Sequence, residues 1–417
     1  MTKPGSISDE IDARAAAIEQ SMIGWRRDLH QHPELGNREF RTAQRIAAHL
    51  ERLGIRVRTG VAHTGVVGVL EGGRAGGVVA LRADMDALPM TEELDLPFAS
   101  KERATYNGEE VGVMHSCGHD GHVAILMGVA EVLASVRAQI AGSVTFIFQP
   151  AEEGAPAGEE GGAELMVREG ALRDPAPTAI FGLHIGNRAE VGQIGARRGS
   201  AMASVDSFEI TVRGRQTHGA YPWLGVDPIV VAAQIVLALQ TIPSRQLDVS
   251  KAPSILTIGK IHGGIRNNVI PDEVRLSGTI RALDDGMRRQ IHERIRKTAE
   301  GIAASAGAAA EVAIEFGYPG VWNEPGLFMA MLPTLQRVAG ESNVFTIIPS
   351  LGAEDFSFFQ KEIPGLFFVL GTRPRGVTQE MAAPGHSPRF FVDESGLLLG
   401  VRALAHLAVD YLASRTP

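Results

Sequence analysis

The sequence predicts an α/β protein of two domains, in which a smaller β-α-β-β-α-β domain is inserted into a larger one. The chain of 417 residues exceeds what one hydrophobic core usually supports. In the first 199 residues, short β-branched runs alternate with helical patterns, as in α/β folds. From Ser204 the order changes to strand, helix, strand, strand, helix, strand, which is typical of the ferredoxin-like sandwich. We therefore expect a discontinuous first domain at 1–199 and 319–417, and an inserted domain at 200–318.

Hydrophobic periodicity assigns the elements of the larger domain. Apolar residues spaced by four and three between Ile11 and Leu29 predict a helix that ends near Pro33, because proline disfavours helix in the residue before it. A second helix starts near Glu39 and stops at Gly54. The remaining elements are helices at about 122–136 and 326–338 and after Asp393, and strands at 66–70, 78–81, 143–148, 179–183 and 365–371.

The inserted domain shows the same two periodicities in another order. Strands are expected at 204–213, 254–261, 273–281 and 310–316, and helices at 226–242 and 284–305. Pro228 suits the first turn of the earlier helix, where its missing N–H is not needed. The polar candidates here are His218, Asn268 and Arg281. By residue type alone, His218 is better explained as a hairpin-loop residue, Asn268 as a turn former and Arg281 as an exposed charge on a strand.

Polar residues follow three predicted strands of the larger domain at the point where each strand ends. They are Asp84 with Asp86, Glu152 with Glu153, and His184, in chain order. Each alone is explained as a turn cap or a solvated loop charge. In open α/β sheets, however, ligands bind outside the carboxyl ends of the strands. Three such strand ends together favour a functional site.

One short stretch, 114–122, is rich in possible metal ligands. It contains the only cysteine, Cys117, with three histidines and an aspartate, loosened by two glycines. Thiolate, imidazole and carboxylate are ligands of borderline-soft divalent metals. The alternative is a histidine-rich loop before a helix, with Cys117 as a small buried hydrophobic residue. The polar strand ends described above favour the metal site.

A loop after the last predicted strand adds one more donor. The candidate metal ligands are then Cys117, His119, Glu153, His184 and His386. Five donors exceed one tetrahedral zinc site, so they suit two ions that share a ligand and leave positions for water and substrate. Hydrolysis also needs a base that is not bound to metal, and Glu152 fits that role. Asp86 fits a partner that holds a ligand histidine.

A resemblance to a known family rests on seven motifs that occur in order along nearly the whole chain. They are 25–35 (WRRDLHQHPEL), 84–89 (DMDALP), 115–120 (HSCGHD), 149–154 (QPAEEG), 182–184 (GLH), 268–272 (NVIPD) and 385–388 (GHSP). In this combination the chain resembles the co-catalytic metal amidohydrolases, which include hippurate hydrolases, N-acyl-amino-acid hydrolases and the plant auxin-conjugate hydrolases.

The resemblance implies an α/β/α metallopeptidase-like catalytic domain with a mixed sheet, and an inserted lid and dimerisation domain. It implies two divalent ions on the five ligands above, with zinc as the first candidate and manganese, cobalt or nickel as alternatives, and Glu152 as general base. It also implies that His218 reaches the oxyanion in its own or the partner subunit's site, and that Asn268 and Arg281 hold the substrate's carboxylate. A homodimer through the inserted domain is therefore expected.

The chain departs from the family at two places where substrate would pack. Relatives often carry a second histidine in the loop after His218, and here that segment reads Ala220-Tyr221-Pro222-Trp223. Before Asn268 the chain has Arg266-Asn267, where small residues are usual. These departures leave the identity of the substrate open.

Composition excludes several other classes of protein. The net charge of −8 argues against a nucleic-acid surface, which needs a basic face. A single cysteine makes no intramolecular disulfide, the first residues have no apolar signal-peptide core, and no apolar run is expected to cross a membrane. The glycine-rich turn at 72–77 lacks the spacing of a dinucleotide-binding loop. We therefore expect a cytoplasmic enzyme without nicotinamide or flavin.

The predicted activity is metal-dependent hydrolysis of the amide bond of N-acyl or N-aroyl amino acids, releasing a carboxylate and a free amino acid. A dipeptidase or aminopeptidase is the alternative within the same chemistry, but it needs an acid for the free α-amine and none can be assigned. A non-catalytic metal-binding protein is disfavoured, because every ligand position and Glu152 are present.

Overall fold

The computed structural model describes residues 6–415, which separate into two compact units. Unit 1 contains the described residues up to Gly199, Trp322–Ile348 and the chain from Phe358 onward, and unit 2 contains Ser200–Val321 and Pro349–Ser357. The segment 349–357 groups with unit 2, whereas the sequence assigned it to the larger domain. The physical reason is backbone pairing, because the N–H of Ala203 donates to the carbonyls of Ser350 and Gly352 at 2.9 and 3.1 Å.

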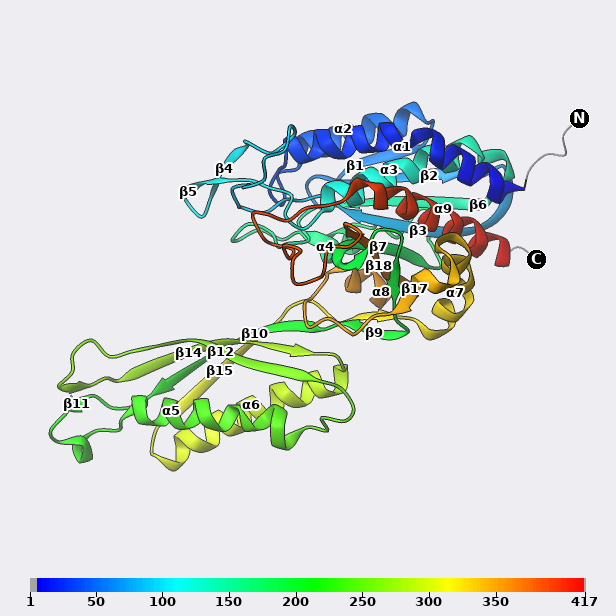
Figure 1. Cartoon of the computed structure of the whole chain (residues 1–417). Helices are drawn as coiled ribbons and strands as arrows, with labels where there is room; N and C mark the ends of the chain where they lie inside the picture. Colours follow the sequence, from blue (N-terminus) through cyan, green and yellow to red (C-terminus); the bar gives the residue numbers. More distant parts are fainter. Residues whose placement is uncertain (1–5, 416–417) are drawn as a thin grey trace, which may run out of the picture. The chain divides into compact units, whose positions relative to one another are not determined.

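Unit 1 is built around an eight-stranded mixed sheet with the order β1-β2-β6-β3-β7-β18-β8-β17 (Figure 1). Its strands are β1 (Arg56–Val61), β2 (Gly65–Glu71), β3 (Arg74–Asp84), β6 (Ala141–Gln149), β7 (Ile180–Glu190), β8 (Ile194–Ala196), β17 (Val344–Thr346) and β18 (Gly365–Arg373), with a separate hairpin of β4 (Arg103–Tyr106) and β5 (Glu109–Gly112). Its helices are α1 (Ile7–Gln31), α2 (Phe40–Arg52), α3 (His119–Ser135), α4 (Gly162–Arg168), α7 (Pro325–Ala339), α9 (Leu397–Ser414) and α8 (Phe356–Glu362), which starts within the 349–357 segment.

The centre of this sheet is parallel. β6, β3, β7 and β18 run in the same direction, whereas β1 and β2 are antiparallel additions at one side and β8 pairs antiparallel with β18. Asp84 pairs with Gln149, so the carboxyl ends of β3 and β6 lie at the same level of the sheet. The predicted fold class, α/β with a mixed sheet, is confirmed.

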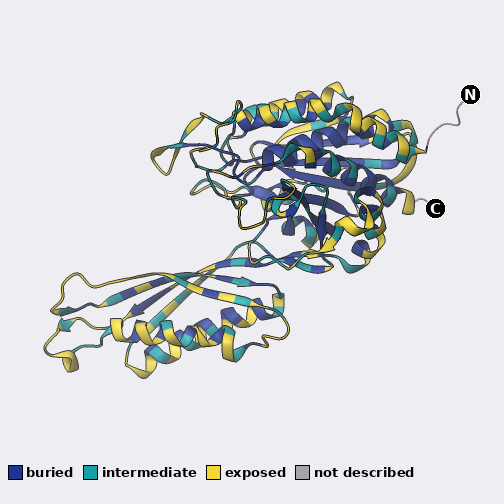
Figure 2. Cartoon of the chain, viewed as in Figure 1, coloured by how far each residue is buried: buried dark blue, intermediate teal, exposed yellow. Residues whose placement is uncertain are grey.

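Both faces of the central strands are covered. Most residues of β3, β6 and β18 are buried (Figure 2). α3 and α9 pack directly on these strands, and α1 packs on α3 and α9. Strands buried on both faces need continuous apolar runs, which explains the sequence of β6, AGSVTFIFQ.

One helical segment, Glu394–Ser414, is long and apolar enough to cross a membrane by length and composition, which corrects the expectation that no such run exists. However, 67% of its apolar window is buried, where α9 packs against α3, α7 and the sheet. A core helix of this kind passes the same test because it is apolar around most of its circumference.

Unit 2 has the predicted split β-α-β topology. Its elements are β10 (Ser204–Arg213), α5 (Pro228–Leu239), β12 (Ser254–Gly263), β14 (Glu273–Ala282), α6 (Asp285–Ser305) and β15 (Ala309–Phe316), with short strands β11 (Thr217–His218) and β13 (Val269–Ile270). The sheet order is β12-β14-β10-β15 and all neighbours are antiparallel. Asp227 and Asp284 cap α5 and α6, and Pro228 opens α5 as expected. β9 (Gly199–Met202) and β16 (Val321–Asn323) lie where the chain passes between the units.

Several elements of unit 1 were missed by the sequence analysis. β1 is an edge strand with a mostly exposed, arginine-containing sequence, so it lacks the apolar alternation that marks a strand. The β4–β5 hairpin turns at Asn107 and Gly108, both with positive φ (51° and 83°), and this Asn-Gly pair was a readable turn signal. β7 continues to Glu190, so His184 lies within a strand instead of after its end.

Candidate metal centre

Six of the predicted site residues converge in unit 1. Three triplets have ligand atoms that all lie within 4.8 Å of one another, namely Cys117 with His119 and His184, Cys117 with Glu153 and His386, and His119 with Glu152 and Glu153. Because Cys117, His119 and Glu153 each belong to two triplets, the three groups form one continuous cluster. Its donors are one sulfur, three imidazole nitrogens and two carboxylates, a set that suits zinc and similar divalent ions.

Individual distances within the cluster are short. Sγ of Cys117 lies 3.3 Å from Nε2 of His184. Nε2 of His386 lies 3.0 Å from Oε1 of Glu153, and Nε2 of His119 lies 3.8 Å from Oε2 of Glu152. These separations place the donor atoms of residues as far apart in sequence as Cys117 and His386 within the reach of shared ions.

Unusual backbone geometry positions the side chains of the cluster. Gly118 has φ of 90° and lies against Ile185, and a Cβ at this glycine would come within 2.4 Å of the Ile185 Cδ1 atom. The tight turn lets Cys117 precede α3 directly, with His119 as the first helical residue. Ala151 and His386 also have positive φ, 51° and 61°, which is uncommon for residues other than glycine. Such strained positions collect at functional sites.

Asp86 connects two of the ligands, as expected of a supporting carboxylate. Nδ1 of His119 lies 2.9 Å from the backbone oxygen and 3.2 Å from Oδ1 of Asp86. The other oxygen, Oδ2, accepts a hydrogen bond of 2.9 Å from the backbone N–H of Glu153. Nε2 of His119 is buried and has no hydrogen-bond partner among the described residues. A buried nitrogen without a partner is costly unless it binds an ion, so the residues present fit a metal.

The charges of the cluster favour ionised ligands. Burial raises the pKa of the Cys117 thiol, but His184 and His119 outweigh it and lower the pKa to about 6. Hydrogen bonds to Cys117 and Glu153 raise the pKa of His386 to about 10. These shifts favour a Cys117 thiolate beside a protonated His386, and a divalent ion at the cluster would take the place of that proton.

His122 and Asp84 bond to each other beside the cluster, and the sequence analysis gave neither of them an individual role. His122 bonds through Nδ1 to Asp84, and its Nε2 accepts from the N–H of Ile185 at 2.8 Å. Burial lowers the pKa of His122 to about 4, so its ring is neutral. Both its nitrogens make hydrogen bonds, so it holds the backbone of β7 at Ile185, next to His184, and neither nitrogen is left for a metal ion. Its spacing of three from His119, on one helix face, was the available signal.

Residues of the motif at 25–35 support the first turn of α3, which carries the candidate ligand His119. Asp120, the neighbour of His119, bonds to Nε of Arg26 at 2.7 Å and to Nδ1 of His30 at 2.8 Å, all three being buried. Glu34 accepts hydrogen bonds from the N–H groups of Arg41 and Thr42 at the start of α2. These contacts fix the first turns of two helices and explain why Arg26 and His30 are buried although they are polar.

Glu39 supports the second acidic loop. Its Oε1 atom accepts from the N–H of Ala151 at 2.9 Å and its Oε2 atom from the hydroxyl of Thr64 at 2.5 Å. Burial, with the nearby charge of Asp86, raises the pKa of Glu39 to about 8. This side chain therefore holds the positive-φ residue that precedes Glu152 and Glu153.

The three candidates of unit 2 do not lie together. His218 is exposed in β11, opposite Val269 in β13, and the carbonyl of Asn268 accepts from the N–H of Gly219 at 2.9 Å. Arg281 pairs with Val205 near the other end of β14. Because a strand rises about 3.3 Å per residue, β14 separates Arg281 from the Asn268 end by roughly 25 Å. Within one chain, this separation is too long for Asn268 and Arg281 to hold the same carboxylate, and their predicted shared role stays a prediction.

The orientation of His218 defines its hydrogen-bonding state. The N–H of Ala220 donates to Nδ1 at 3.0 Å, so Nδ1 acts as an acceptor. The neutral ring therefore carries its proton on Nε2. This leaves Nε2 as a hydrogen-bond donor, as the proposed contact with an oxyanion requires.

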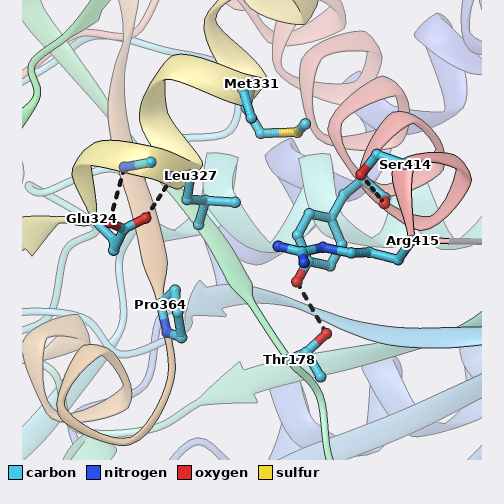
Figure 3. A pocket seen from close by; sticks show the side chains of 10 residues that line it. Thr178, Glu324, Leu327, Met331, Pro364, Ser414 and Arg415 are labelled. Carbon is cyan, nitrogen blue, oxygen red and sulfur yellow. Dashed lines mark hydrogen bonds between the residues drawn. The ribbon is translucent and has the colours of Figure 1, made fainter.

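Two cavities accompany unit 1. One of about 130 Å³ lies beside Asp86 and Glu153. It is bounded by Leu35 and Arg38 and by Tyr106, which belongs to the β4–β5 hairpin. The other, of about 350 Å³, is lined by Thr178, Pro364, Leu327, Met331, Tyr411 and Arg415 (Figure 3). Pro364 immediately precedes β18 and Thr178 lies shortly before β7, so this larger cavity lies at the amino ends of these parallel strands. No predicted site residue lines it.

Comparison with known proteins identifies the family. A profile described as peptidase family M20/M25/M40 matches residues 80–410, most of the chain. The chain belongs to this family. M20 relatives include thermostable carboxypeptidase 1 of Saccharolobus solfataricus, 40% identical with 94% of this chain and 96% of the relative covered. They also include N-acetylcysteine deacetylase of Bacillus subtilis, 39% identical with 95% and 98% covered.

A solved M20 structure agrees with the fold. A dinuclear-metal-binding peptidase of the family from Bacillus subtilis superimposes with a TM-score of 0.80 at 36% identity, covering 95% of this chain and 99% of that one. The predicted amidohydrolase and metallopeptidase resemblance is confirmed, and the chain is a hydrolase that acts on amide bonds.

Proposed function

We propose that this protein is a metal-dependent hydrolase of N-acyl or N-aroyl amino acids that releases a carboxylate and a free amino acid. Two divalent ions, zinc first among the candidates, would be held by Cys117, His119, Glu153, His184 and His386. The observation that carries the proposal is the convergence of these five residues, together with the buried Nε2 of His119, which makes no hydrogen bond to the described residues. The name of the deacetylase relative supports the acyl substrate.

The bound ions would lower the pKa of a water molecule and polarise the amide carbonyl. Glu152 is 7% exposed, follows β6 and lies beside His119, in reach of a water at the cluster. It takes one proton from the attacking water as the oxygen bonds to the carbonyl carbon, and it returns that proton to the amide nitrogen as the C–N bond breaks. His218 donates from Nε2 to the carbonyl oxygen as negative charge develops there.

We also propose a homodimer through unit 2, which the separation of its candidate residues supports. In this dimer the two ends of β14 contribute to two different active sites. His218 and Asn268 of one subunit complete an active site to which the other subunit contributes Arg281. Exposed apolar residues on α5 and the edge strand β12 support such an interface, and they are Ile229, Val230, Leu237, Ile255 and Ile261. The cytoplasmic location and the absence of nucleic-acid and membrane partners stay predictions.

The carboxypeptidase relative favours a second candidate, hydrolysis of peptides with a free carboxylate. The test is a panel of N-acetyl and N-benzoyl amino acids and the corresponding free dipeptides. It is assayed with chelator-stripped protein reloaded with zinc, manganese, cobalt or nickel. Metal-restored hydrolysis of acylated substrates, at least tenfold above that of free dipeptides, supports the proposal. Preference for dipeptides with a free amine would contradict it.

A further inference from the structure

We propose that Tyr221 and Trp223 form the surface that receives the acyl group of the substrate and that they favour aromatic acyl groups over acetyl. This inference rests on the proposed function, because it names the substrate class of the same site. It concerns the segment Ala220-Tyr221-Pro222-Trp223 in the loop after His218, where relatives often carry a second histidine.

The two rings are exposed and continuous with His218. The ring centroids of His218 and Tyr221 are 5.4 Å apart, and those of Tyr221 and Trp223 are 5.7 Å apart. Tyr221 is 51% exposed, Trp223 is 73% exposed and the adjacent Leu224 is 60% exposed. Three large apolar side chains that remain in water beside one polar ring mark a contact surface, because burial of such area is the main source of binding energy.

The loop that carries these rings is closed by hydrogen bonds. The N–H of Tyr221 donates to the carbonyl of His218 at 2.8 Å, and the N–H of Leu224 donates to the carbonyl of Tyr221 at 3.0 Å. At its base, Arg215 and Val226 exchange two backbone hydrogen bonds of 2.9 and 3.0 Å. Pro222 restricts the backbone further. The rings are therefore preorganised, which reduces the entropy lost on binding.

The chemistry of the amide places the acyl group beside these rings. If Nε2 of His218 donates to the carbonyl oxygen, the first acyl carbon lies roughly 5 Å or less from Nε2, since it is bonded to the same carbonyl carbon. Tyr221 is in ring contact with His218 and so lies within reach of that acyl group. The amino-acid arm carries a carboxylate, which would lose hydration without compensation against two aromatic faces. The acyl arm therefore fits this surface better.

The test compares kcat/KM for N-benzoyl and N-acetyl forms of one amino acid that the wild-type enzyme accepts. Trp223→Ala and Tyr221→Ala should each lower the benzoyl-to-acetyl ratio about five- to tenfold, mainly through KM, as expected for one lost aromatic contact. Trp223→Phe should recover most of the ratio. Trp322→Ala, the same change at an exposed tryptophan of unit 1, should leave the ratio unchanged.

Three results would overturn the inference. The first is an unchanged benzoyl-to-acetyl ratio in folded Trp223→Ala and Tyr221→Ala, with folding checked by circular dichroism. The second is a shift in amino-acid preference without a shift in acyl preference. The third is loss of the dimer in sedimentation of Trp223→Ala, which would make the surface a subunit interface. If the metal-loaded wild-type enzyme hydrolyses no acylated amino acid, the proposed function itself fails and this inference with it.

Discussion

At the scale of single residues, the two nitrogens of His119 have different environments. Nδ1 lies against Asp86, which fixes the orientation of the ring, and Nε2 is buried without a hydrogen-bond partner among the described residues. A ligand histidine needs this arrangement, because the bond to a carboxylate or carbonyl raises the basicity of the nitrogen that binds the ion. Asp86 also holds the backbone of Glu153, so one carboxylate aligns two ligands.

Glu152 and Glu153 are adjacent but should behave differently when substituted. Glu152→Gln removes the base without removing a ligand, so we expect both ions to stay bound while kcat falls about 10²- to 10⁴-fold. Glu153→Gln should instead lower the metal content. Mass spectrometry of bound metal, measured together with kcat for the same samples, separates the two effects. A Glu152→Gln enzyme that keeps most of its rate would show that another group takes the proton.

Candidate ligands could be predicted from sequence because their residue types and their clustering in short motifs are local features. The supporting residues were harder to assign. Asp84 and His122 bond to each other across 38 positions, and only the packing of α3 on β3 brings them together. By sequence, Glu39 is an ordinary acidic residue at the start of a helix. Its burial depends on contacts with Ala151, which lies 112 residues later in the chain.

At the scale of elements, the turn before α3 determines where Cys117 and His119 lie. Gly118 and Gly108 both have positive φ, but only Gly118 is crowded, since nothing lies within 4 Å of a Cβ built on Gly108. Gly118→Ala should therefore combine backbone strain of about 1–2 kcal/mol with a clash against Ile185. We expect it to lower both the melting temperature and zinc affinity.

The matched control is Gly108→Ala, which carries the backbone strain alone. It should destabilise by only about 1 kcal/mol and leave zinc affinity unchanged. Thermal unfolding and competition with a chromophoric chelator measure the two quantities. Equal effects of the two substitutions on zinc affinity would show that the turn does not position the ligands.

Within unit 2, a buried ionic group joins β10 to α6. Asp206 accepts 2.8 Å and 2.7 Å hydrogen bonds from Arg288 and His292, and a 3.1 Å bond from the N–H of Gly317. Burial acts to raise the pKa of Asp206, but Arg288 and His292 outweigh it and lower the pKa to about 2. A carboxyl whose folded-state pKa is depressed stabilises fully above its ordinary pKa, and this stability is lost as pH falls through the folded value.

We therefore expect unit 2 to lose stability between about pH 4 and pH 2 through Asp206. Asp206→Asn should remove this part of the pH dependence and cost about 3 kcal/mol at neutral pH, because Arg288 stays buried without its carboxylate. Melting temperatures from pH 7 to pH 2 measure both effects. Asp285→Asn, at an exposed position of α6, is the control. Parallel pH curves for wild type and Asp206→Asn would contradict the account.

At the scale of the whole molecule, the sequence predicted the order of elements better than their pairing. The strands β3 and β6 were recognisable as apolar runs, but no local sequence pattern indicates that β3 lies between β6 and β7 in the sheet. The edge strands β1 and β17, and β8 next to β17, are short or polar, so they carry weak signals. Asn268 and Arg281 were grouped by role, and only the antiparallel register of β14 shows that they lie at opposite ends.

This separation predicts complementation between subunits. Arg281→Ala and His218→Ala should each be nearly inactive, but a mixed dimer contains one site with both residues intact. After subunit exchange, activity should return to roughly a quarter of the wild-type value per chain, because half of the dimers are mixed and one of two sites works. Absence of recovery, with exchange verified by native mass spectrometry, would show that both residues act in the same subunit or that no such dimer forms.

The central claim is that two ions share the cluster of Cys117, His119, Glu153, His184 and His386. A crystal structure of the zinc-loaded protein with anomalous scattering tests it most directly. The account predicts two peaks about 3.5–4 Å apart, with these five side chains as ligands and Glu152 near both but bound to neither. A single ion, or ions bound away from these five residues, would contradict it.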